Sequence, residues 1–222
     1  MKKTTTFLSQ VTSVPVATSW LLAEIAECHG RESLFTRQSP QALRALRDTA
    51  MVQSVESSNR IEGVEVAPDR LRPLVLGRAK PADRSEAELH GYREALKLIY
   101  ADAGKTPITP AFIKQLHKMI QAESGDAGQF KKIDNEIVEL KPGQSPVVRF
   151  VPVPAKQTAK AVEEICRGHR LYLDQKKIPP LLADALMVLD FLCIHPFRDG
   201  NGRVSRLLTL HALHMHGYEV GR

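Results

Sequence analysis

The chain contains the segment His195-Pro196-Phe197-Arg198-Asp199-Gly200-Asn201-Gly202-Arg203-Val204-Ser205-Arg206. It follows a strongly apolar run, 181–194, and leads into a predicted helix over 204–216. Glycines such as Gly200 and Gly202 allow backbone conformations and close approaches that other residues resist. The first amides of a helix have no partner inside that helix, and the helix dipole favours anions there. The segment therefore predicts an anion cradle suited to phosphates.

The side chains of this segment predict a reaction as well as a binding site. Arg203 and Arg206 are three residues apart, so both project from one side of the helix, where two cations favour a polyanionic ligand. Asp199 offers the hard oxygen that Mg2+ bound to phosphates prefers. His195 has an ordinary pKa suited to accepting a proton near neutral pH. Together these groups indicate transfer of a phosphorus-containing group from a nucleotide, whereas a plain turn would need only the glycines.

Helical patterns dominate the rest of the chain, and the expected fold class is mainly α. The apolar run 181–194 predicts the central core helix, and Trp20 is expected to pack an N-terminal helix onto the core. Residues typical of helix starts and helix ends interrupt the apolar pattern. They predict helix starts after the caps Ser39, Ser85 and Thr109 and near Ala155 and Pro180, and a helix stop at Gly63.

The region from Lys132 to Pro154 differs, because apolar residues alternate on both sides of a turn at Pro142-Gly143. Two strands alone do not form a stable sheet, so the predicted hairpin should lie against the helices. An exposed strand edge is a place where an extended peptide can add. The residues that we expect to contact such a peptide are Ile133, Ile137, Val138, Val148 and Phe150.

The composition limits the classes of protein to which the chain can belong. The chain has 222 residues, which suits one domain, and a formal net charge of +6. Its basic residues are scattered and only 5% of residues are aromatic, which argues against nucleic-acid binding. The 3 cysteines form no CxxC pair, so we expect a reducing, cytoplasmic environment. The apolar run 181–194 is shorter than the ~20 residues of a membrane span, so no membrane partner is expected.

The segment 195–206 resembles the signature of the Fic domain family, HxFx(D/E)GNGRxxR, at every specified position. The resemblance extends to Gly128-Gln129-Phe130-Lys131 before the hairpin and to the stretch 150–154 that closes it. Lys131 stands where the family pattern leads us to expect arginine. The resemblance implies a Fic-fold helical bundle with a short β-hairpin, the family's flap.

The resemblance also implies transfer of AMP from ATP to a Tyr, Thr or Ser hydroxyl of a target protein, with Mg2+ as cofactor. His195 would be the base, and Asp199 would hold the metal ion. Arg203 would contact the β-phosphate region and Arg206 the γ-phosphate, while the flap would clamp the target. The residues implied to bind the nucleotide are Gly200, Asn201, Gly202, Arg203, Val204, Ser205 and Arg206.

A second motif lies near residue 60. Ser58 and Glu62 are four residues apart on one helical face, with Gly63 following as a stop. A carboxylate in the last turn opposes the helix dipole at a cost of about 0.3–1 kcal/mol, which a nearby arginine would offset. The motif resembles the inhibitory sequence (S/T)xxxE(G/N) of class II Fic proteins. The resemblance implies autoinhibition, in which Glu62 pairs with Arg206 and misaligns the bound ATP.

The expected organisation is an N-terminal helical region, 1–80, with the inhibitory helix at about 40–63, and a Fic core at 81–222. Many family members continue further at the C-terminus, so a truncated core is one expectation. Removal of AMP by the same site, alone or beside its transfer, remains an alternative. So does a regulator that binds nucleotide without catalysis, although such a protein needs neither His195 nor Asp199. A homo-oligomer is also left open.

Overall fold

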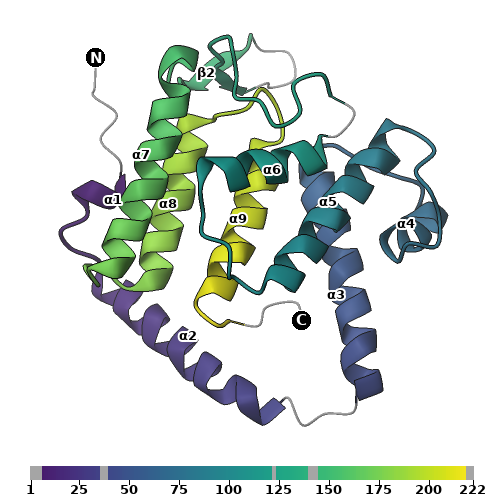
Figure 1. Ribbon diagram of the computed structural model, residues 1–222, viewed down its shortest axis with the longest axis horizontal. Coiled ribbons are helices and arrows are strands. Elements are labelled where there is room, and N and C mark those ends of the chain that lie inside the picture. Colours follow the sequence, from purple (N-terminus) through teal and green to yellow (C-terminus); the bar gives the residue numbers. More distant parts are fainter. Residues whose placement is uncertain (1–6, 36–39, 122–123, 140–144, 219–222) are drawn as a thin grey trace.

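The chain folds into a bundle of helices with a two-stranded hairpin at one end (Figure 1). The computed structural model describes residues 7–35, 40–121, 124–139 and 145–218, and within 32–43 the backbone alone. The predicted mainly α fold with a hairpin is confirmed. In chain order the elements are α1 (Phe7–Gln10), α2 (Val16–Phe35), α3 (Pro40–Ile61), α4 (Pro68–Val75), α5 (Arg84–Asp102), α6 (Pro110–Ile120), β1 (Ile137–Glu139), β2 (Val147–Phe150), α7 (Ala155–Asp174), α8 (Pro180–Ile194) and α9 (Asn201–Met215).

Helix α9 occupies the centre of the bundle, where it contacts α3, α5, α6 and α8 (Figure 1). Its residues Val204, Leu207 and Leu208 are fully buried. The prediction that the apolar run 181–194 is the central helix is wrong, because α8 leaves Leu189 42% exposed. The overall apolar content misleads here, since the central helix α9 also buries polar side chains such as Arg203, which donates to Glu88 of α5 and to Asn59 of α3.

Local signals located most helix ends. The Thr109 hydroxyl accepts the Phe112 amide and begins α6, as predicted. The predicted cap Ser85 is wrong, because Asp83 caps α5 and accepts the Glu86 amide at 2.8 Å. Helix α9 begins at residue 201, three residues before the prediction. The predicted cap Ser39 and turn Pro142-Gly143 lie outside the described residues.

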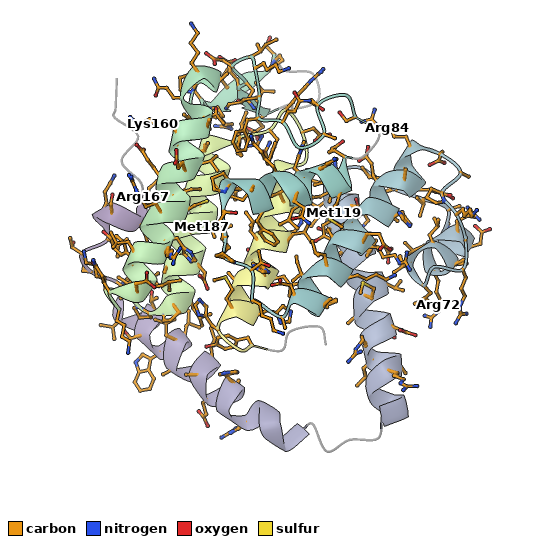
Figure 2. The ribbon with its side chains drawn as sticks, in the orientation of Figure 1. Arg72, Arg84, Met119, Lys160, Arg167 and Met187 are labelled. Atoms are coloured by element: carbon orange, nitrogen blue, oxygen red, sulfur yellow. The ribbon has the colours of Figure 1, made fainter. Side chains whose placement is uncertain are left out.

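Helix α2 runs along the outside of the bundle (Figure 1). The prediction that Trp20 packs onto the core is wrong, because this residue is 68% exposed. Val16, Leu21 and Ile25 are exposed as well, so the apolar residues of α2 do not form one stripe that could dock. By contrast, α7 has an outer face with Lys160 and Arg167, as Figure 2 shows.

The aspartates of α8 have specific partners. Asp190 accepts the backbone amides of Phe7 and Leu8 and so holds α1 against α8. Asp184 lies 2.7 Å from Nε2 of His169 and 3.1 Å from Nε2 of His216.

Among the described helices, none is both long and apolar enough to cross a bilayer.

The hairpin is antiparallel, with Ile137 opposite Phe150 and an irregularity after Ile137. Its root is attached to the bundle, because Asp134 Oδ1 accepts the Ala155 amide at 2.6 Å and so caps the start of α7. All four residues of β2 are exposed, which leaves the hairpin open to solvent. The predicted hairpin is therefore present, held at its base beside α7.

Candidate active site

The site is built on the loop 195–200, between the buried helices α8 and α9. His195 ends α8 in the left-handed conformation (φ +50°), and its amide donates to the Phe191 carbonyl at 2.9 Å. Gly200 precedes α9 with φ +77°, and a Cβ on it would lie 3.2 Å from Ile120 Cδ1. Conformation and space therefore both favour glycine at this position. The loop brings the base and the start of α9 together, as the sequence predicted.

The interior of the loop is held by Phe197 and Asn201. Phe197 is fully buried and stacks on His117, with ring centroids 3.8 Å apart. The Asn201 amide group binds both the N–H and the C=O of Phe197 at 2.9 Å. The Asn201 side chain thus shapes the loop, and only its backbone remains for the predicted cradle.

His117 is a site residue that the sequence analysis missed. Its Nδ1 accepts the Gly128 amide at 2.9 Å, so Nε2 carries the proton and faces the Asp199 carbonyl at 3.1 Å. Burial lowers the pKa of His117 and favours this neutral form. A signal was present in the sequence, because His117 lies on the apolar face of α6, four residues after Ile113.

His195 is half-buried and suited to accept a proton. Burial lowers the pKa of its imidazole most, a hydrogen bond with the Leu192 backbone raises it, the charge of Lys131 lowers it, and the charges of Glu62 and Asp199 raise it. Its Nδ1 is buried in the protein. At neutral pH the ring is therefore neutral, with Nε2 as the nitrogen left for a substrate.

Asp199 points its carboxylate outward, and the side chain is 62% exposed. Oδ1 accepts the Gly200 amide at 2.6 Å, and Oδ2 accepts from Gln121 Nε2 at 3.1 Å. Within the described part of the chain, no three His, Cys, Asp or Glu side chains gather into a metal cage. A single exposed carboxylate fits Mg2+, which takes one or two protein carboxylates together with phosphates and water.

Arg206 is held by the end of α3. Its Nη2 donates to Glu62 Oε1 at 2.7 Å and to the Ser58 carbonyl at 2.8 Å, and its Nε donates to the Ser58 hydroxyl. Helix α3 ends at Ile61, and Gly63 follows with φ +75°. Glu62 thus lies just past the helix, and the structure brings the predicted residues Ser58 and Glu62 onto Arg206.

The Glu62 carboxylate also lies against the start of α9. A Cβ built on Gly202 would collide with Glu62 Oε1, so glycine at this position lets the Glu62 carboxylate lie close to the backbone of α9. The first turn of α9 is where an anion is stabilised by free amides and by the helix dipole. The predicted anion cradle therefore already faces an anionic side chain of the same protein.

Arg203 lies in a different environment from the one predicted. Its side chain is 1% exposed, and Nη1 donates to Glu88 Oε2 at 2.6 Å and to Asn59 Oδ1 at 3.4 Å. Asp199 Oδ2 lies 3.7 Å from its Nη2. Both arginines project toward the end of α3, as their spacing predicts, because Arg203 reaches Asn59 and Arg206 reaches Ser58, but α3 and α5 bury Arg203.

Val204 and Ser205, which were predicted to bind nucleotide, lie in the first turns of α9. The Val204 side chain is fully buried, and its amide donates to the Gly200 carbonyl at 2.9 Å. The Ser205 hydroxyl donates to the Gly202 carbonyl at 2.7 Å. The core therefore takes up the Val204 side chain, and the helix backbone accepts the Ser205 hydroxyl proton.

Four of the five predicted peptide-binding residues of the hairpin are exposed, from Phe150 at 40% to Ile133 at 82%, and Ile137 is half-buried. A cavity of about 570 Å³ opens at the root of the hairpin, between the segment 125–135 and Arg198. Lys131 lines this cavity, and its ammonium group donates to the Ile194 carbonyl at 3.1 Å. The cavity and the loop with His195 are therefore neighbours.

Comparisons with known proteins agree with this geometry. Residues 107–213 match the family described as the Fic/DOC family. Over 196 residues, 88% of its length, the chain is 21% identical to the protein adenylyltransferase and cysteine protease IbpA of Histophilus somni (strain 2336). The chain spans only 4% of that much longer protein.

Solved structures share the fold. A Fic domain containing signaling protein from Bacteroides thetaiotaomicron is 23% identical with a TM-score of 0.73, and the match covers 87% of this chain and 73% of that one. A Fic family protein from Desulfovibrio desulfuricans is 21% identical with a TM-score of 0.68, over 90% and 58%. Fic-1 from C. elegans is 22% identical with a TM-score of 0.63, over 89% and 58%.

Proposed function

We propose that this protein is an adenylyltransferase that transfers AMP from ATP to a Tyr, Thr or Ser hydroxyl of a target protein and of itself. The observation that carries the proposal is one loop that joins a neutral imidazole, His195, to a helix start that faces the Glu62 carboxylate. The resemblance to an adenylyltransferase and the Fic/DOC domain support the same reaction class.

In the proposed reaction, Nε2 of His195 takes the proton of the target hydroxyl. The hydroxyl oxygen then bonds to the α-phosphorus, the bond from that phosphorus to the oxygen bridging to the β-phosphate breaks, and pyrophosphate leaves. Backbone amides at the start of α9 would stabilise the charge on the phosphates. Asp199 would hold Mg2+, which when bound neutralises phosphate charge.

Glu62 acts as the brake in this proposal. Its carboxylate binds Arg206 and lies over Gly202, where the phosphates would be received. ATP bound beside it would lack Arg206 as a γ-phosphate partner. A displacement of the reacting atoms by about 1 Å can cost on the order of a hundredfold in rate. The class II arrangement inferred from the sequence is thus supported by this contact.

The two arginines receive different roles. Arg206 is partly exposed and becomes free to bind phosphate when Glu62 withdraws. Arg203 is sealed by Glu88, so we assign it to holding the first turn of α9 in place rather than to the β-phosphate. The exposed hairpin would pair with the backbone of the target, bringing its hydroxyl toward His195.

Labelling with α-32P-ATP and Mg2+ tests the proposal. Glu62→Gly should raise self-labelling about a hundredfold over wild type, because it releases Arg206 and clears the cradle. Glu62→Gly/His195→Ala should remove the label, because the base is gone. Glu65→Gly is the matched control, since it makes the same change at an exposed glutamate outside the helix and should leave labelling at the wild-type level.

Absence of label from every variant, with folding confirmed by thermal melting, would contradict the adenylyltransferase. Equal labelling of wild type and Glu62→Gly would contradict the brake alone. Loss of AMP from pre-labelled protein in the presence of Glu62, and not in Glu62→Gly, would instead indicate removal of AMP by the same site.

A further inference from the structure

Residue 131 contacts the peptide groups on both sides of His195. The Lys131 backbone amide donates to the Pro196 carbonyl at 2.8 Å, and the Lys131 ammonium group donates to the Ile194 carbonyl at 3.1 Å. Lys131 lies in the segment before the hairpin, far from His195 in sequence, and is 7% exposed. One buried residue therefore fastens the chain immediately before and immediately after the base.

His195 needs such support because of its backbone conformation. It occupies the left-handed region at φ +50° and ψ +61°, which residues other than glycine adopt at a cost. The Ile194 carbonyl is among the last carbonyls of α8, which have no partner inside the helix and carry the negative end of its dipole. The Lys131 ammonium group donates a hydrogen bond to this carbonyl, and its positive charge lies at the negative end of the helix dipole.

The rest of the Lys131 surroundings keep the ammonium group in place. It also donates to Asn135 Oδ1 at 2.7 Å, and Asn135 Nδ2 reaches the Phe197 carbonyl at 3.4 Å. Burial lowers the pKa of Lys131 to about 8, against a raising effect of Asp134, so the group is mainly charged at pH 7. The carbonyls of residues 194, 196 and 197 are thus all bound from the segment 131–135.

The charged side chains around the His195 imidazole shift its pKa in opposite directions. Lys131 disfavours a second proton on His195, whereas the carboxylates of Glu62 and Asp199 favour it. When Glu62 withdraws, two of these three charged side chains, Lys131 and Asp199, still act on His195. Lys131 then opposes Asp199 and keeps the ring able to accept a proton.

We propose that Lys131 is a positioning residue, which holds His195 in its left-handed turn and keeps a positive charge beside the imidazole. This proposal rests on the role of His195 as the base of the proposed function. It assigns a task to the residue at which the chain departs from the arginine expected of its family, because lysine and arginine share the charge and the donors that the task needs.

The test is a titration of the His195 ring by NMR, without ATP or metal. The resonance is assigned by its absence from His195→Ala. Lys131→Met and Lys131→Gln should raise the pKa of His195 above the wild-type value, since both remove the charge. Lys131→Arg should leave it near that value. Lys132→Met is the matched control, because it removes an exposed neighbouring charge and should have little effect.

Self-labelling in the Glu62→Gly background gives the second readout. Lys131→Met should lower the labelling rate about 10- to 100-fold, and Lys131→Arg should restore it. Lys131→Gln keeps a donor for the Ile194 carbonyl, so it serves if the methionine variant does not fold. An unchanged His195 titration in a folded neutral variant overturns the proposal, as does unchanged labelling. Because the titration needs no reaction, its result stands even if the protein transfers no AMP.

Discussion

The first turns of α9 contain two arginine sites with similar geometry and opposite surroundings. Arg203 lies 2.6 Å from Glu88, and the two side chains are 1% and 10% exposed. Arg206 lies 2.7 Å from Glu62, and these side chains are 32% and 26% exposed. Ion pairs of nearly equal length therefore differ in what their loss costs: a buried charge without its partner is strongly destabilising, whereas a half-exposed charge can turn to water.

The largest effect is expected at the buried site. Glu88→Ala removes the carboxylate 2.6 Å from the buried Arg203 guanidinium and leaves Asp199 at 3.7 Å, so the free energy of unfolding should fall by about 3–5 kcal/mol. Urea unfolding measures this change. Glu62→Ala, the same substitution at the half-exposed site, should change the free energy of unfolding by about 1 kcal/mol or less. Equal losses in the two variants would erase the distinction between the sites.

The second effect concerns activity rather than stability. Glu62→Ala should raise self-labelling about a hundredfold, because the carboxylate no longer occupies Arg206 and the cradle. Glu88→Ala should not raise it, since that change disturbs the turn that carries the site. The measurement is the initial rate of α-32P incorporation at a temperature where both variants are folded. Activation by Glu88→Ala would mean that the buried pair is also part of the brake.

A smaller effect is expected from Ser58→Ala. This change removes the hydroxyl that accepts from Arg206 Nε, while the Ser58 carbonyl and Glu62 still bind Nη2. A partly exposed hydrogen bond contributes about 1 kcal/mol, so labelling should rise about fivefold. Labelling equal to that of Glu62→Ala would show that the hydroxyl holds Arg206 as firmly as the carboxylate does.

The smallest effect is a displacement of the pH profile. The pKa of His195 is lowered, so the base is neutral and labelling is constant above its ordinary value of about 6.5. Labelling then falls at lower pH, where the ring gains a proton. Glu62 raises this pKa, so the acid limb of Glu62→Ala should lie at lower pH than that of Ser58→Ala, which keeps the carboxylate. Coincident acid limbs would mean that Glu62 does not influence His195.

Local sequence was a good guide to helix ends, because a cap forms between residues only a few positions apart. Thr109 illustrates this, with its hydroxyl on an amide three residues along. The same reasoning placed the start of α5 incorrectly, because Asp83 and Ser85 are both residue types that cap helices. Local spacing also brought Ser58 and Glu62 to one face, since their separation is close to one helical turn.

Burial was less predictable, because it depends on elements that are distant in sequence. Trp20 was expected in the core by residue type, yet α2 offers no single apolar face to the bundle. The apolar content of α8 suggested the central position, yet α9 occupies it although it carries the buried Arg203, which Glu88 of α5 binds. Lys131 departed from the family pattern, and nothing local linked it to the carbonyls around His195.

The sequence by itself determined the helical class, the hairpin and the chemical groups of the loop 195–206, because these follow from residue type and short spacing. Only the tertiary structure decided which of the two arginines is buried and which is partly exposed. Arg203 and Arg206 are equivalent in local spacing, and their difference arises where Glu88 of α5 and Glu62 after α3 reach α9. Exposure to water, and with it the strength of each charge pair, is set by the packing of helices far apart along the chain.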